Sequence, residues 1–177
     1  MKMFSLVLLA LLVKSYGANI NSPQTEIKFN IVNAGFNVDG TMALKDIEMK
    51  FDPESLATSF IYASADPSSI QTGIGIRDKH LKRADYFHVT KYPEISIRSK
   101  TFKKTGRHKF AGQFDLTIKG ITKTVSIPFT MTKENDTMKY EAFFEINRLE
   151  YAIGEPSITV EDNVKVTVTI YGPLVQN

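Results

Sequence analysis

The sequence contains no cysteine at any of its 177 positions. Disulfide bonds, metal sites built from thiolates and cysteine nucleophiles are therefore excluded. The chain is long enough for one ordinary domain and too short for two. A domain of this size can bury a sizeable core without covalent cross-links, so the lack of cysteine does not contradict an exported protein.

Residue patterns that carry catalysis are also missing. The three histidines are His80, His88 and His108, and none of them has the one-turn spacing of a helical zinc site. No Gly-x-Ser-x-Gly elbow is present, and Gly73-Ile74-Gly75 lacks the third glycine and the lysine of a phosphate-binding loop. We therefore predict no enzyme, no catalytic cofactor and no metal site. A hydrolase that uses His80 is the weaker alternative.

The chain has no concentrated positive charge. It carries 22 lysines and arginines against 19 acidic residues, and two of the bases, Lys2 and Lys14, fall in an N-terminal leader, which leaves 20 against 19. These bases are scattered among acids, whereas a protein that binds nucleic acid presents a basic face to the phosphates. We predict no nucleic-acid partner.

No apolar run is long enough to cross a bilayer, which takes about 20 residues. Residues 3–13 are apolar except for Ser5, follow Met1-Lys2, and precede Ser15-Tyr16-Gly17. A basic start, a short apolar stretch and small residues before a cleavage site are typical of a secretory signal peptide. We expect a signal peptide at residues 1–17, a mature domain at 18–177 without a membrane span, and a periplasmic or secreted location. A membrane anchor is the alternative that the short run disfavours.

What the mature chain has in abundance is alternation of apolar and polar residues, the pattern of half-buried strands. We predict strands at residues 27–31, 36–44 and 47–51 (one strand or two), 59–65, 95–100, 110–119, 125–131, 144–146 and 164–171. Asn33-Ala34-Gly35 and Lys119-Gly120 supply turns. The inner face of residues 59–65 is left open, because both of its phases contain apolar side chains.

One segment departs from the alternation. Residues 77–87 have few β-branched side chains and many good helix formers, so we predict a short helix that ends before Tyr92-Pro93. About eight strands without a strand–helix–strand rhythm indicate an all-β, antiparallel fold. Closing the sheet into a barrel buries its apolar face and removes its edges, whereas a two-sheet sandwich is the alternative.

Six stretches of the sequence carry a resemblance to a known family. They are Ser69-Ile70-Gln71-Thr72-Gly73, Arg77-Asp78-Lys79-His80-Leu81, Asp85-Tyr86-Phe87, Lys91-Tyr92-Pro93-Glu94-Ile95, residues 112–123 and residues 147–154. Their order and spacing resemble the YceI-like family of exported, lipocalin-like proteins, also called polyisoprenoid-binding proteins. The resemblance extends from about Thr25 to Ile170. The chain departs from the family pattern at Tyr86, and at residues 150–153, where Glu-Tyr-Ala-Ile replaces Asp-Phe-Gly-Ile.

The resemblance implies an extended, eight-stranded lipocalin-like barrel whose apolar tunnel holds an isoprenoid or a similar lipid. A quinone, a polyprenyl phosphate or a fatty amide would fit this description, bound for transport, storage or stress protection, and a homodimer is common in the family. Each buried CH₂ group stabilises such a complex by about 0.8 kcal/mol. The alternative is a filled barrel that acts as a structural or stress-response interaction module, because side chains alone can fill eight strands.

The alternating residues give the predicted wall of the tunnel. We predict that it consists of Phe29, Ile31, Ile97, Phe114, Leu116, Ile118, Ile127, Phe129, Phe144, Ile146, Val166 and Val168. The predicted helix at residues 77–87 would cap or flank the opening, with Leu81 and Phe87 facing inward.

Three cationic side chains are candidates to meet a polar head group: Arg77, His80 and Arg148. Cations suit a phosphate or carbonyl oxygen. The structural alternatives are that Arg77 pairs with an acid such as Asp78 or Asp85, that His80 hydrogen-bonds within the helical segment, and that Arg148 holds a strand end.

Overall fold

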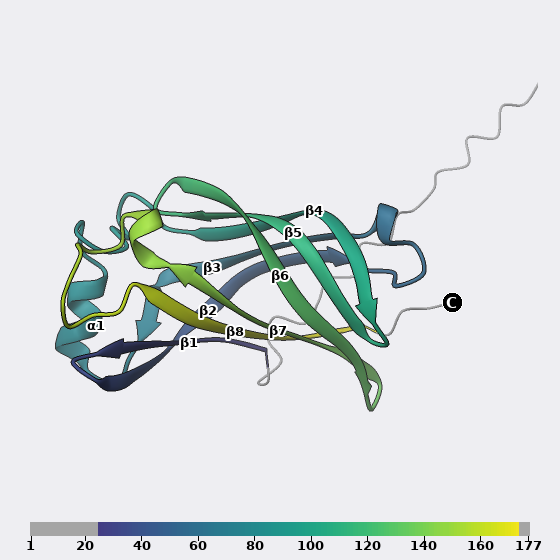
Figure 1. The fold of residues 1–177 in the computed structure, drawn as a ribbon, viewed down its shortest axis with the longest axis horizontal. Helices are drawn as coiled ribbons and strands as arrows, with labels where there is room; N and C mark the ends of the chain where they lie inside the picture. Colours follow the sequence, from purple (N-terminus) through teal and green to yellow (C-terminus); the bar gives the residue numbers. More distant parts are fainter. Residues whose placement is uncertain (1–24, 174–177) are drawn as a thin grey trace, which may run out of the picture.

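The computed structural model describes residues 25–173, which form one closed antiparallel barrel, elongated as Figure 1 shows. The predicted signal peptide at residues 1–17 lies outside the described residues. Each strand pairs with the next, and β1 also pairs with β8. This confirms the eight-stranded all-β barrel and excludes the sandwich. The elements are β1 (Glu26–Asn33), β2 (Phe36–Lys50), η1 (Leu56–Thr58), β3 (Phe60–Gln71), α1 (Gly75–Leu81), β4 (Ile95–Gly106), β5 (Lys109–Ile118), β6 (Ile121–Glu134), β7 (Thr137–Asn147), η2 (Arg148–Tyr151) and β8 (Asn163–Pro173).

Two hairpins close where the sequence predicts turns. Ala34 and Gly35 have φ of 51° and 80°, and Lys119 and Gly120 have φ of 51° and 77°. Two consecutive left-handed residues are the signature of the tight turn whose twist matches that of the flanking strands. These turns join β1 to β2 and β5 to β6 with two residues each.

The predicted stretches 36–44 and 47–51 form a single strand, β2, of 15 residues. Its register against β3 shifts between Thr41 and Ala43, and again between Leu44 and Asp46. Such irregularities change which residues of a strand face inward. As a result Met42 and Ile47 are both buried although they are an odd number of residues apart.

The helical segment is shorter than the predicted helix at residues 77–87. α1 covers Gly75–Leu81, and residues 82–87 form turns. The chain reverses there because the Phe87 amide donates to the Leu81 carbonyl (3.0 Å), which returns the Phe87 ring to the barrel interior. No helix within residues 25–173 is both long and apolar enough to cross a membrane.

The interior of the barrel divides into two halves. One end carries α1, the β1–β2 turn and the loop between η2 and β8 (Figure 1), and we call the interior beside it the α1 half. Towards the other end Phe51 makes edge-on contacts with Phe102, Phe110 and Phe129, with ring centroids 5.0–5.2 Å apart. We call this region the packed half, and its buried residues are Ile47, Met49, Phe51, Ala63, Phe110, Phe129, Met131, Met138, Tyr140 and Ile170.

Candidate functional site

The α1 half contains a cavity of about 390 Å³. Small side chains keep it open, namely Ala65 on β3 and the valines at 164, 166 and 168 on β8, with Ala63 at the boundary to the packed half. Fourteen predicted residues line it: Phe29, Ile31, Arg77, His80, Leu81, Phe87, Ile97, Leu116, Ile118, Phe144, Ile146, Arg148, Val166 and Val168. The wall is apolar over most of its extent, and its polar side chains come mainly from the α1 end.

Three predicted wall residues, Phe114, Ile127 and Phe129, do not line this cavity. All three are buried, with 4–7% of each side chain exposed. Phe114 packs edge-on against Phe102 (5.7 Å), and Phe129 stacks on Phe110 (5.6 Å). They face inward as predicted, but they lie at levels of the barrel where neighbouring rings fill the space. The predicted tunnel is therefore a pocket that ends at the packed half.

Sequence reasoning missed about half of the wall. The additional residues are Ile27, Asn33, Val38, Met42, Leu44, Ala63, Ser64, Ala65, Ile70, Thr72, Tyr86, Ile95, Ser96, Ile153, Val160 and Val164. Ile27, Ile95 and Val164 share the phase of predicted neighbours, so the alternation could have identified them. Met42 and Leu44 lie where register shifts interrupt β2, so one alternation does not describe the whole strand. Ile153 and Val160 lie in an irregular loop, which has no periodicity.

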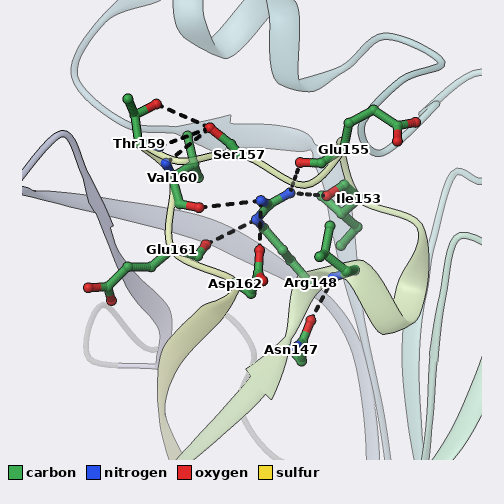
Figure 2. Close-up of polar contacts among 10 residues, drawn as sticks. Asn147, Arg148, Ile153, Glu155, Ser157, Thr159, Val160, Glu161 and Asp162 are labelled. Atoms are coloured by element: carbon green, nitrogen blue, oxygen red, sulfur yellow. Dashed lines mark hydrogen bonds and ion pairs between the residues drawn. The ribbon is translucent and has the colours of Figure 1, made fainter.

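Arg148 is a buried structural hub, shown in Figure 2, with 4% of it exposed. Its guanidinium donates to the carbonyls of Ile153, Glu155, Val160 and Glu161 and to the Asp162 carboxylate, over 2.9–3.4 Å. Arginine has five N–H donors, and these five bonds use all of them. The contacts support its alternative role, which is to hold the end of β7 to the loop before β8, and leave no donor for a head group.

Arg77 keeps a donor available at the cavity. Its Nε donates to Thr72 Oγ1 (2.7 Å) and its Nη2 to the Thr72 carbonyl (2.6 Å). Thr72 in turn donates through its amide and hydroxyl to Asp78 Oδ1. Arg77 therefore meets Asp78 through Thr72, and not in the direct ion pair given as the alternative. Its Nη1 has no hydrogen-bond partner among residues 25–173, so it can serve an oxygen atom within the cavity.

His80 marks the place where the cavity reaches the surface. Its side chain lines the cavity and is 53% exposed. Its Nε2 lies 2.8 Å from Asp85 Oδ2, and its ring packs edge-on against Tyr86 with centroids 5.0 Å apart. The hydrogen bond from His80 lowers the pKa of the Asp85 carboxyl. This pair fastens the turn after α1 beside the opening.

The part of the chain that the structure describes contains no cluster of side chains that could bind a metal ion. Within residues 25–173 no three histidine, aspartate or glutamate side chains come together in a way that could hold a metal ion. This arrangement can enclose an apolar molecule that carries an oxygen atom, with that oxygen placed near Arg77.

Comparison with known proteins places the chain among relatives of similar sequence. A UPF0312 protein of Photorhabdus laumondii is 34% identical over 115 residues, which is 64% of this chain and 59% of that protein. Protein YceI of Shigella flexneri is 31% identical over 112 residues, which is 62% of this chain and 58% of that protein. The aligned part of the chain thus spans less than two thirds of the length of either relative.

Solved structures show the same barrel. BcnA of Burkholderia cenocepacia superposes with a TM-score of 0.80 at 21% identity, covering 84% of this chain and 96% of its own. A polyisoprenoid-binding domain of Saccharophagus degradans gives 0.66 at 11% identity, covering 90% and 99%. At these identities the likeness concerns the fold. A sequence model of the YceI-like domain matches residues 19–171, and the chain belongs to the YceI-like family.

Proposed function

We propose that this protein binds one lipid with a long apolar tail, an isoprenoid or a similar chain, in the cavity of the α1 half. The observation that carries the proposal is the apolar cavity itself, about 390 Å³ in a barrel whose other half is filled by its own side chains. Its volume lies in the range of about 300–1,000 Å³ typical of ligand pockets. The domain of Saccharophagus degradans that shares this fold is a polyisoprenoid-binding domain, which supports the class of ligand.

The arrangement of polar groups supports one orientation of the lipid. The deep wall consists of residues such as Ala65, Leu116 and Val166, whereas Thr72, Arg77 and His80 lie at the α1 end. A tail placed against the deep wall gains about 0.8 kcal/mol for each buried CH₂ group. The head group then meets Arg77 Nη1, which suits the carbonyl of a quinone or fatty amide, or a phosphate oxygen. The packed half limits the length of tail that can enter.

Native mass spectrometry of protein purified without organic solvent tests the proposal. We expect a mass adduct that solvent extraction removes and that returns when the extracted protein is incubated with geranylgeraniol. Val166→Trp fills the cavity and should prevent binding, whereas Lys165→Trp, the neighbouring and outward-facing position on β8, should not. Both variants must retain the far-ultraviolet circular dichroism of the unmodified protein.

Two outcomes would favour other functions. If the protein carries no adduct and takes up no geranylgeraniol, the filled-barrel interaction module becomes the better explanation. If the extracted lipid changes chemically during incubation with the protein, the barrel is an enzyme and the proposal of a pure binding protein is wrong.

We also propose that the barrel acts outside the cytoplasm, where it transports, stores or protects its lipid. The pattern of residues 1–17 supports export. N-terminal sequencing of the protein recovered from intact cells should find Ala18 as the first residue. The homodimer that the family resemblance implies stays a prediction, which light scattering after gel filtration tests.

A further inference from the structure

Among the described residues, four of the five exposed large apolar side chains gather at one end of the barrel. Ile74, Ile76, Phe36 and Ile158 are 50%, 81%, 75% and 105% exposed. Ile74 and Ile76 flank the start of α1, Phe36 follows the β1–β2 turn, and Ile158 lies in the loop before β8. All three segments lie at the same end in Figure 1, and the loop and turn are bonded directly, Ala34 N to Thr159 O, at 2.6 Å. Soluble proteins seldom leave apolar groups clustered in this way without a partner.

The same end is where the cavity reaches the surface. Arg77 and His80 line the cavity from α1, and Asn33 and Val160 line it from the turn and the loop. Each of these residues lies within four positions of an exposed apolar residue in the sequence. The exposed apolar side chains therefore lie on the same segments that form the entrance through which a lipid would pass.

The surface of α1 and of the turn after it also carries positive charges that form no salt bridge with the described residues. Lys79 and Arg83 are exposed and make no salt bridge with any of residues 25–173, and the same holds for half-buried Lys82. The two acids of this segment are engaged, Asp78 with Thr72 and Asp85 with His80. Lys79 follows Ile76 by three positions, so both side chains lie on the face of α1 opposite Arg77 and Leu81, which line the cavity.

We propose that Ile74, Ile76, Lys79 and Arg83 dock the open end of the barrel onto a lipid bilayer that contains anionic lipid. The isoleucines enter the boundary between head groups and acyl chains, and the cations contact lipid phosphates. The loop around Ile158 carries Glu155 and Glu161 instead of bases, so it contributes apolar contact only. The purpose of docking rests on the proposed function, since a lipid then moves between bilayer and cavity without crossing water.

Sedimentation with vesicles tests the docking. The unmodified protein should bind vesicles of phosphatidylethanolamine and phosphatidylglycerol, and bind phosphatidylcholine vesicles more weakly. Ile74→Ser with Ile76→Ser should weaken binding by roughly tenfold or more, because both side chains lose apolar burial. The matched control is Phe143→Ser, since Phe143 is 57% exposed on β7 in the barrel wall.

A second pair of variants tests the charges. Removal of one cation near an anionic surface should weaken binding roughly fivefold, and reversal to glutamate by more. Lys79→Glu with Arg83→Glu should therefore abolish the preference for anionic vesicles. Lys103→Glu with Lys109→Glu changes the same charge on the exposed far parts of β4 and β5, and should have a much smaller effect.

Three results would overturn the docking proposal. They are failure of the unmodified protein to bind anionic vesicles, equal loss of binding in the Phe143 variant, and a dimer that Ile76→Ser dissociates, which would show that the apolar face binds a second copy. Native mass spectra of the same samples separate this proposal from the function. The isoleucine variants should keep the lipid adduct. Vesicle binding by a protein that carries no adduct and takes up no geranylgeraniol would contradict the lipid-binding function and leave the docking proposal standing.

Discussion

The two halves of the barrel interior belong to one closed sheet whose strands alternate apolar and polar residues, yet one half is filled and the other is hollow. The packed half places aromatic rings such as Phe51, Phe110 and Phe129 across the axis. In the α1 half, the inward-facing positions hold smaller side chains, such as those of Ala65 and Val166. Alternation therefore determines which side chains face inward, and the size of those side chains determines whether a cavity remains.

The halves also differ in what stabilises them. Burying a large apolar side chain contributes about 1.5–3 kcal/mol, and the packed half gains this repeatedly. The α1 half buries less apolar surface around its cavity, and hydrogen bonds hold its loops in place. Arg148 ties η2 to the loop before β8, and Thr72 links Arg77 to Asp78. We infer that stability resides mainly in the packed half, and four predictions test this.

The largest expected effect comes from deleting a ring in each half. Phe110→Ala should lower the free energy of unfolding by about 3–5 kcal/mol, because Phe110 is 2% exposed and contacts Phe51 and Phe129. Phe144→Ala should lower it less, since Phe144 lines the cavity and has fewer contacts to lose. Urea titrations of the lipid-free protein measure both, and equal losses would contradict the division into two halves.

The next effect concerns the polar hub of the α1 half. Arg148→Lys should lower the free energy of unfolding by about 3 kcal/mol, because the buried lysine would offer three donors to the five acceptors that surround Arg148. Amide exchange should accelerate most at residues 153–162. The control is Arg107→Lys in the exposed turn between β4 and β5, where the effect should stay within about 0.5 kcal/mol. If Arg148→Lys instead loses the lipid adduct while the free energy of unfolding and the amide exchange stay unchanged, Arg148 contacts the lipid head group.

Much of this architecture could be predicted from the sequence, and the limits have physical causes. The strands, the turns at Ala34-Gly35 and Lys119-Gly120, and the closed barrel follow from periodicity and turn chemistry. The level of the cavity does not, because Phe114 and Leu116 share one phase of β5 while only Leu116 lines it. Periodicity also fails where register shifts interrupt β2, and it says nothing about the irregular loop that carries Ile153.

The role of Arg148 shows a second limit. An arginine near a predicted strand end fits both a head-group contact and a structural bond, and sequence alone cannot show which acceptors surround it. Here the acceptors are mostly backbone carbonyls, which every residue possesses. The residue types in the loop before β8 therefore give almost no indication that Arg148 bonds to it. The order of β7, η2 and β8 in space had to be known first.

A third prediction uses one glycine in each half. A methyl group at Gly112, in β5, would overlap the Phe114 ring and lie 3.1 Å from Phe102, in a region without spare volume. Gly112→Ala should therefore lower the free energy of unfolding by about 1–3 kcal/mol.

The matched variant in the α1 half is Gly40→Ala, whose methyl group would overlap the tip of the Phe29 ring. Phe29 lines the cavity and can turn into it, so the loss of stability should be smaller and the lipid adduct should decrease. A larger destabilisation at Gly40 than at Gly112 would mean that the cavity wall is as rigid as the packed half.

The smallest effect is expected at Ala152, at the edge of the α1 half. Ala152 ends η2 in the left-handed conformation, with φ of 52° and ψ of 39°. A residue with a Cβ atom is disfavoured there by about 1–2 kcal/mol, whereas glycine is not, although glycine also gains freedom in the unfolded chain. Ala152→Gly should therefore raise the free energy of unfolding by about 0.5–1 kcal/mol in urea titrations. Ala57→Gly, in the exposed η1 turn where no positive φ occurs, should lower it instead. If both substitutions destabilise the protein equally, Ala152 does not hold the left-handed conformation in solution. The backbone at the α1 end would then be more adaptable than the packed half.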